Sequence, residues 1–139
     1  MITDEENVLI LRLLETMKRI LLVEDDEDIQ EVLGLFLRSK GYQVDQYTHI
    51  HSLQYYLEQI KEKKPDLIIS DIFIPEIDGR ELCKFVKQQD DTKRIPYILI
   101  SAGNFTKEEI LNTCGDVFIA KPFDIGTIER TVEKFISAA

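Results

Sequence analysis

The chain lacks a surplus of basic residues, long apolar runs and a leader-like start. Its 139 residues carry 17 Lys and Arg against 26 Asp and Glu, which gives a formal net charge of -9. Because a nucleic-acid backbone is bound through basic patches, we do not expect direct binding of nucleic acid. No apolar run approaches the roughly 20 residues of a membrane-spanning helix, and the N-terminus lacks the basic start and cleavage site of a signal peptide. These absences predict a cytoplasmic protein that does not contact a membrane.

Cysteine is also scarce, because Cys83 and Cys114 are the only two in the chain. Two cysteines at this separation have neither the pattern of a disulfide framework nor the close spacing of a metal site. A cysteine without such partners usually behaves as a small apolar side chain. We therefore expect both residues to be buried free thiols in a reducing cytoplasm.

What the chain does contain is an ordinary globular composition, 44% hydrophobic and 31% charged, at a length that suits one domain. Short apolar runs predict buried strands at residues 20–23, 42–47, 67–70, 97–100 and 117–120. Apolar residues at helical spacing follow each run: Ile29, Val32, Leu33, Phe36 and Leu37; Leu53, Tyr56, Leu57 and Ile60; Leu82, Phe85 and Val86; Ile110 and Leu111; and Ile125, Ile128, Val132, Phe135 and Ile136. This alternation predicts an α/β fold, a doubly wound five-stranded parallel sheet with helices on both faces.

The first sixteen residues precede the predicted α/β domain. Thr3 and Glu6 have the spacing of a capping box, and apolar residues recur at helical spacing after them, which predicts an extra N-terminal helix over residues 3–16. We divide the chain into this extension, residues 1–16, and one domain, residues 17–139. The segment could also be the trace of an alternative start. As a helix it has too many apolar side chains to leave in water, so it should pack on its own domain or form a homodimer.

Charged side chains follow three of the predicted strands. Glu24 and Asp25 end the run at 20–23, Asp71 ends the run at 67–70, and Lys121 ends the run at 117–120. In an open parallel sheet, ligands bind where the carboxyl ends of the strands meet. Acids gathered there repel one another unless a cation joins them. The arrangement therefore predicts a site for a metal ion and a phosphoryl group.

Four motifs carry a resemblance to a known family: ILLVEDD at 20–26, PDLIISDIFIPEIDG at 65–79, PYILISA at 96–102 and FIAKPF at 118–123. In this order, each at a strand end, they resemble the receiver domain of response regulators in two-component signalling, which has the CheY-like, flavodoxin-like fold. The resemblance covers residues 18 to about 137. It implies a receiver that accepts a phosphoryl group from a sensor histidine kinase or a phosphotransfer protein and signals by conformational switching.

The resemblance also assigns a phosphoacceptor and a metal. Asp71 matches the carboxylate nucleophile that takes the phosphoryl group. Asp25, Asp71 and the backbone carbonyl of Phe73 match direct ligands of Mg²⁺, and Glu24 matches the acidic position that acts through water. This donor set suits Mg²⁺, which prefers oxygen ligands and keeps several waters.

Three further residues complete the implied site. Lys121 matches the ammonium that neutralises the transferred phosphoryl group, and Ser101 matches the hydroxyl that meets its oxygens. Ser101 and Phe118 match the pair whose movement carries the switch. The implied contact with an output protein or domain is the face of residues 106–111, 117–120 and 125–136.

Two rival functions stay open at this point. A degenerate receiver would act only as a protein-interaction module. An aspartyl-phosphate hydrolase would be the enzyme alternative, but such enzymes usually carry a second acid two residues after the nucleophile, where this chain has Phe73. We therefore expect no enzyme beyond phosphorylation and dephosphorylation of its own Asp71.

Overall fold

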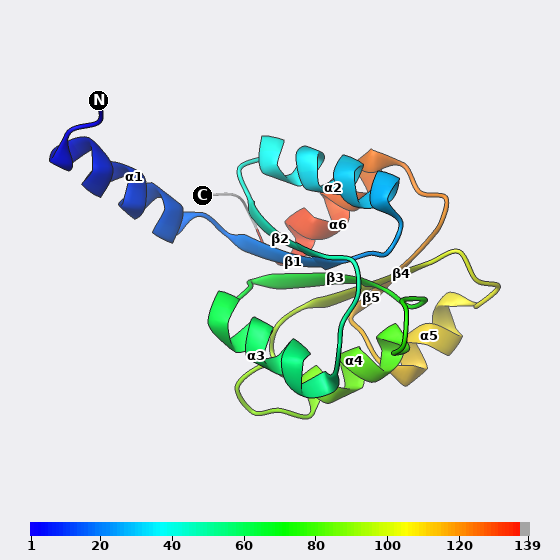
Figure 1. Ribbon diagram of the computed structural model, residues 1–139. Coiled ribbons are helices and arrows are strands. Elements are labelled where there is room, and N and C mark those ends of the chain that lie inside the picture. The colour runs from blue at the N-terminus through cyan, green and yellow to red at the C-terminus, as the bar shows by residue number, and fades with distance from the viewer. Residues whose placement is uncertain (137–139) are drawn as a thin grey trace.

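Strands and helices alternate along the computed structural model, which describes residues 1–136 apart from the side chain of Leu111 (Figure 1). Its strands are β1 Arg19–Val23, β2 Gln43–Tyr47, β3 Leu67–Asp71, β4 Tyr97–Ser101 and β5 Val117–Ala120. Its helices are α1 Asp4–Thr16, α2 Glu27–Ser39, α3 Leu53–Lys63, α4 Gly79–Lys87, α5 Lys107–Thr113 and α6 Ile125–Phe135. The predicted alternation is confirmed.

The strands form one parallel sheet in the order β2-β1-β3-β4-β5. Helices α2 and α6 cover one face, and α3, α4 and α5 cover the other (Figure 1). From β1 the chain crosses to β2 on one side and later to β3 on the other, so the order reverses between β1 and β3. This reversal opens a crevice at the carboxyl ends of those strands, which is where such folds bind ligands.

The core has two layers, one on each face of the sheet. In β1, Leu21 packs with the α3, α4 and α5 side, whereas Ile20 and Leu22 pack with the α2 and α6 side. Every residue of β3 and β4 is buried. Burial on both faces explains why these strands read as continuous apolar runs in the sequence. The packed strands fix the ends from which the site residues project.

Two residues of the apolar helical stripes are not buried. Val32 on α2 and Phe135 at the end of α6 are 54% and 38% exposed. In α2, the buried line runs through Leu33 and Leu37, and Val32 is turned about 100° from Leu33 around the helix axis. Phe135 is the last residue of α6.

Helix α1 projects away from the rest of the molecule (Figure 1). The capping box predicted at Thr3 and Glu6 is present, and the helix begins at Asp4 as a result. No residue of α1 is buried. The side-chain amide of Gln43 donates a hydrogen bond to the carbonyl of Leu14 near the base of the helix. The expectation that the helix packs on its own domain is therefore contradicted.

The two cysteines form a disulfide bond, which corrects the expectation of free thiols. Cys83 lies on the buried face of α4, Cys114 is the C-cap of α5, and their Cα atoms are 6.1 Å apart. Their separation of 31 positions along the chain hides this proximity in the sequence. It arises because α4 and α5 lie on the same face of the sheet (Figure 1).

Within residues 1–136, no helix is both long and apolar enough to cross a lipid bilayer.

Candidate functional site

Asp71 is the last residue of β3 and is 3% exposed. Its Oδ1 accepts a hydrogen bond from the backbone N–H of Phe73, with an N···O distance of 2.9 Å. Its Oδ2 accepts a hydrogen bond from the ammonium of Lys121, with an N···O distance of 2.5 Å. The carboxylate is thus held at a strand end by one backbone donor and one cation.

Lys121 joins the ends of three strands. It follows β5, and its backbone N–H donates to the carbonyl of Ser101 at the end of β4, at 2.8 Å. Its Nζ also donates to both carboxylate oxygens of Glu24, at 2.9 and 3.1 Å. The peptide bond between Lys121 and Pro122 is cis. The resemblance assigns Lys121 to a phosphoryl group; in this structure its ammonium bridges Glu24 and Asp71.

The electrostatics of the site depend on one cation shared between two buried acids. Burial raises the pKa of Glu24 to about 7; the hydrogen bonds from Lys121 oppose this rise, and the neighbouring Asp71 adds to it. Burial also works against the charged form of Lys121, but its hydrogen bonds to Asp71 and Glu24 outweigh that effect and raise its pKa. Lys121 therefore stays protonated, while Glu24 gains or loses its proton near neutral pH.

Three carboxylates converge closely enough to hold a metal ion. Glu24, Asp25 and Asp71 each offer an oxygen, and these oxygens lie within 4.8 Å of one another. Glu24 and Asp71 are buried, whereas Asp25 is exposed and leaves the site open to solvent. The neighbouring Asp26 has a different role, because its side chain caps α2 by accepting from the N–H groups of Asp28 and Ile29. The acidic cluster fits a hard divalent cation, which prefers oxygen donors.

A tight loop after β3 places the expected carbonyl ligand, Phe73, beside this cluster. The N–H of Gly79 donates to the carbonyl of Ile72 at 2.7 Å, and Phe73 forms a bridge with Asp78. A Cβ atom at position 79 would lie 2.1 Å from the carbonyl oxygen of Asp71. Glycine is therefore required for this close backbone approach. We did not predict this role for Gly79.

The two expected switch residues lie at neighbouring strand ends. Ser101 is fully buried at the end of β4, and its Oγ accepts from the N–H of Gly103 at 3.0 Å. Phe118 on β5 is 8% exposed and packs in the core layer that also contains Leu99 and Ile110. The Phe118 ring is thus already buried in this structure.

An aromatic pair that we did not predict lies beside the site. The rings of Phe73 and Phe105 stack with their centroids 5.8 Å apart, and the guanidinium of Arg80 lies 5.0 Å from the Phe105 ring centroid. Phe73 is nevertheless 51% exposed. This pair connects the loop after β3 to the loop after β4, and two separate loops give no sign of it in the sequence.

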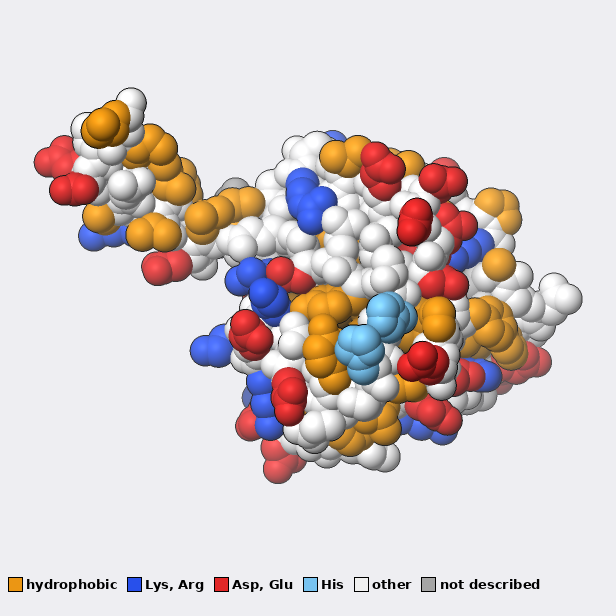
Figure 2. Space-filling view, viewed as in Figure 1, with side chains coloured by type: hydrophobic (Ala, Val, Ile, Leu, Met, Phe, Trp, Pro, Cys, Tyr) orange, Lys and Arg blue, Asp and Glu red, His pale blue; other side chains and the backbone are white. Residues whose placement is uncertain are grey.

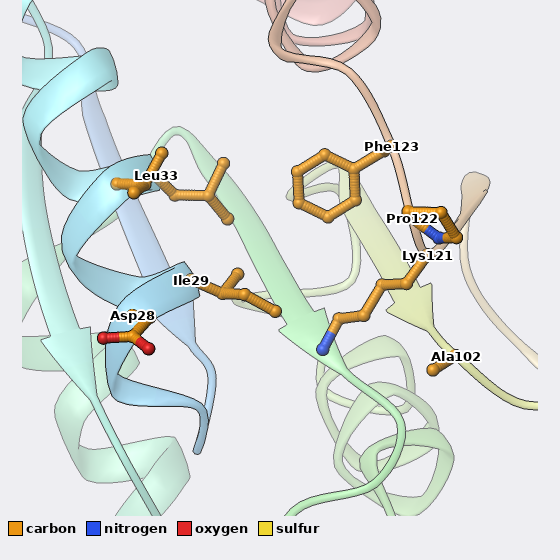
Figure 3. Close-up of a pocket in the computed structure, with 8 residues that line it drawn as sticks. Asp28, Ile29, Leu33, Ala102, Lys121, Pro122 and Phe123 are labelled. Carbon is orange, nitrogen blue, oxygen red and sulfur yellow. The ribbon is translucent and has the colours of Figure 1, made fainter.

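A pocket of about 590 Å³ opens next to Lys121, between α2 and the segment that leads into α6 (Figure 3). It is lined by Asp28, Ile29, Val32, Leu33, Ala102, Lys121, Pro122 and Phe123. Figure 3 shows the Lys121 side chain extended toward α2, where Ile29 points back toward it, with the Phe123 ring above the Lys121 side chain. The cluster of Lys121 and the buried acids therefore adjoins a largely apolar surface.

Comparisons with known proteins agree on one family. A model of the response regulator receiver domain matches residues 20–133. The response regulator ArlR of Staphylococcus aureus is 36% identical over 111 residues, which make up 78% of this chain and 48% of ArlR. The chain spans about half the length of the curated relatives that it matches.

Solved structures show the same relationship. The signal receiver domain of a signal transduction histidine kinase from Syntrophus aciditrophicus is 32% identical with a TM-score of 0.75, over 85% of this chain and 89% of that one. The receiver domain of a sensor histidine kinase from Pseudomonas aeruginosa holds a magnesium ion in its active-site cleft. It is 26% identical with a TM-score of 0.72, over 85% of this chain and 96% of that one. With its crevice of converging carboxylates at the end of a five-stranded parallel sheet, the chain belongs to the response regulator receiver domain family.

Proposed function

We propose that Asp71 is the phosphoacceptor of this receiver domain and that its donor is a phosphohistidine of a sensor histidine kinase or phosphotransfer protein. The main support for this proposal is the position of the Asp71 carboxylate. It lies at a strand end, in contact with the Lys121 ammonium and close to the carboxylates of Glu24 and Asp25. A core aspartate with a purely structural role would not need two further carboxylates beside it, because like charges in a buried site cost free energy.

The chemistry follows from the groups that surround Asp71. One of its carboxylate oxygens attacks the phosphorus, an O–P bond forms, and the bond from phosphorus to the donor nitrogen breaks. The protonated Lys121, already in contact with Asp71, neutralises the charge on the transferred group. The Ser101 hydroxyl, fully buried at the next strand end, donates to a phosphoryl oxygen.

The acidic cluster is assigned to Mg²⁺. Asp25, Asp71 and the carbonyl of Phe73 would hold the ion directly, and Glu24, whose oxygens both contact Lys121, would act through water. When bound, Mg²⁺ supplies positive charge at the oxygens of the transferring group. Loss of the phosphoryl group to water completes the cycle, and the chain turns over no substrate other than its own Asp71.

The partners are assigned to two surfaces. The phosphodonor docks over the apolar pocket beside Lys121, whose lining includes Val32 of α2, a residue that is 54% exposed. The output protein or domain docks on α5, β5 and α6, where a second pocket of about 400 Å³ includes Phe118 in its lining. The net charge of -9 favours protein partners over nucleic acid.

Switching connects these two surfaces through Ser101 and Phe118. When the Ser101 hydroxyl turns to the phosphoryl group, its hydrogen bond with the N–H of Gly103 is lost and the loop before α5 can shift. Phe118 packs in the same layer as Ile110 of α5, so a shift of that helix changes the packing around the ring. Phosphorylation would then change the relative populations of two arrangements of this face.

The boundaries and the setting are part of the same proposal. Residues 17–139 form the receiver domain and residues 1–16 form an extension. The protein acts in the cytoplasm, an assignment that rests on the family and not on free thiols, because Cys83 and Cys114 are paired. The domain match over residues 20–133 supports the boundary.

The test is labelling with a small phosphodonor such as acetyl phosphate, with and without Mg²⁺, read by intact mass. Wild-type protein should gain one acid-labile phosphoryl group only with Mg²⁺, and Asp71→Asn should gain none. Asp90→Asn is the matched control, because its carboxylate is 94% exposed on the surface, and it should label like the wild type. Undiminished labelling of Asp71→Asn would refute the assignment. A wild type that never labels would favour the degenerate interaction module.

A further inference from the structure

Helix α1 exposes a continuous group of apolar side chains. They are between 43% and 64% exposed: Val8, Leu9, Ile10, Leu11, Leu13 and Leu14. Figure 2 shows these hydrophobic side chains along the helix, well separated from the rest of the surface. A helix of 13 residues is also close to the shortest length that is stable alone in water. Both facts indicate that another surface covers α1. We propose that this surface is α1 of a second copy of the chain, packed antiparallel to it.

The molecule's own domain cannot provide that cover. Only Met17 and Lys18 separate α1 from β1, and the Gln43 amide holds the carbonyl of Leu14 at the base of the helix. The start of β1 is fixed as well, because the Arg19 side chain pairs with Asp45 at 2.7 Å. Folding α1 back over the domain would break these contacts at the base of the helix.

The charges on α1 favour a second copy in the antiparallel orientation. The first turn is acidic, with Asp4, Glu5 and Glu6, and the last turn of the helix holds a single acid, Glu15. The bases are Arg12, further along the helix, and Lys18, just after its C-cap. In a parallel pair, the two acidic turns would lie side by side and repel each other. In an antiparallel pair whose helices cross at the level of residue 11 along their axes, each acidic turn lies beside Lys18 of the other copy. The opposed helix dipoles add to the stability of this arrangement.

A lipid surface fits this helix less well. Helices that lie on membranes carry Lys and Arg on their polar face, because many bilayers are anionic. Residues 4–16 instead contain four acids and one base, Arg12. The repulsion between these acids and an anionic bilayer argues for a protein partner of complementary charge.

The helical spacing defines the seam of the dimer. Ile10, Leu13 and Leu14 lie on one face, with Met17 below them, while Val8 points away from that face. Ile10 and Leu14, one turn apart, occupy the centre of the seam. Val8 and Leu11 lie outside it and provide a control of the same chemistry on the same helix.

The test is the mass of the intact chain by light scattering, measured over a range of protein concentrations. The wild type should be a dimer, the double variant Ile10→Asn with Leu14→Asn should be a monomer, and Val8→Asn with Leu11→Asn should stay dimeric. Each variant changes exposed residues, so the domain should remain folded, which circular dichroism verifies. A wild type that stays monomeric throughout would overturn the proposal, as would equal effects of the two double variants.

A charge exchange tests the orientation. Lys18→Glu should weaken the dimer, and adding Asp4→Lys to the same chain should restore it, because the two positions lie on the same flank of the seam and meet between copies only in the antiparallel pair. Failure of this rescue would overturn the antiparallel arrangement. Co-sedimentation of the wild type with anionic vesicles would likewise contradict the proposal, whereas its absence is the expected result. None of these measurements depends on phosphorylation, so they are independent of the role of Asp71.

Discussion

The protonation of Glu24 should make the stability of the metal-free protein depend on pH in an unusual direction. Most carboxylates with favourable partners stabilise a protein as pH rises through their pKa values. Glu24 does the reverse, because burial raises its pKa from 4.5 to about 7 in the folded protein. The folded state therefore holds this proton more tightly than the unfolded state does, and the group favours folding most at low pH.

The size of the effect follows from the shift. One pKa unit corresponds to about 1.4 kcal/mol, so a rise from 4.5 to about 7 amounts to about 3 kcal/mol. This contribution is fully present below pH 4.5, falls as pH rises and is lost above about pH 7. At higher pH the folded protein carries an ionised Glu24 beside Asp71, with the single ammonium of Lys121 between them.

The assay is urea unfolding at a series of pH values between 4.5 and 8 with a chelator present. The variant Glu24→Gln keeps the size of the side chain but has no proton to lose in this range. The unfolding free energy of the wild type minus that of the variant should fall by up to about 3 kcal/mol across the series. Subtraction removes the contributions of the other titrating groups. Parallel curves for the two proteins would refute the reasoning.

Three further changes test other parts of the site and fold. Asp25→Ala should weaken Mg²⁺ binding markedly in calorimetric titration, because it removes the exposed carboxylate of the cluster; wild-type affinity would place the ion elsewhere. Reducing the disulfide, which joins residues 31 apart, should lower the unfolding free energy by about 3–4 kcal/mol in urea melts, and an unchanged melt would contradict its structural role. Gly79→Ala should lower both thermal stability and the labelling rate, because its Cβ would meet the carbonyl of Asp71 at 2.1 Å. At Gly126 a Cβ would lie no closer than 3.1 Å to the Arg130 side chain and 3.3 Å to that of Asp124, so Gly126→Ala should have a much smaller effect on both.

The sheet could be predicted from the sequence because its strands are buried on both faces. The run at 67–70 predicts β3, which ends one residue later at Asp71, and the run at 117–120 coincides with β5. Parallel strands in one sheet share their carboxyl ends, so the order of elements also predicts that Asp71 and Lys121 approach each other. The hydrogen bond from Lys121 Nζ to Asp71 Oδ2 confirms that the two side chains meet.

Contacts outside the sheet could not be predicted in the same way. Periodicity identifies α1 as a helix, but it does not say which surface meets its apolar side chains. The Cys83–Cys114 bond depends on how the end of α5 lies over α4, and neither local pattern nor spacing records that. Val32 is a further example. The apolar residues of α2 do recur at helical spacing, but they cover more of the helix surface than α2 buries, so spacing alone does not show that Val32 is exposed.

The arrangement of charge explains why this crevice is suited to phosphoryl chemistry. With Glu24, Asp25 and Asp71 ionised and Lys121 protonated, the four side chains carry a net charge of -2. A divalent cation neutralises that charge, whereas without one the site relieves it by keeping a proton on Glu24 up to about pH 7. A proton on Glu24 and a bound divalent cation are thus alternative ways to reduce the negative charge of the site. Mg²⁺ binding near neutral pH should therefore release a proton and tighten as pH rises, which links the metal affinity of the site to the burial of Glu24.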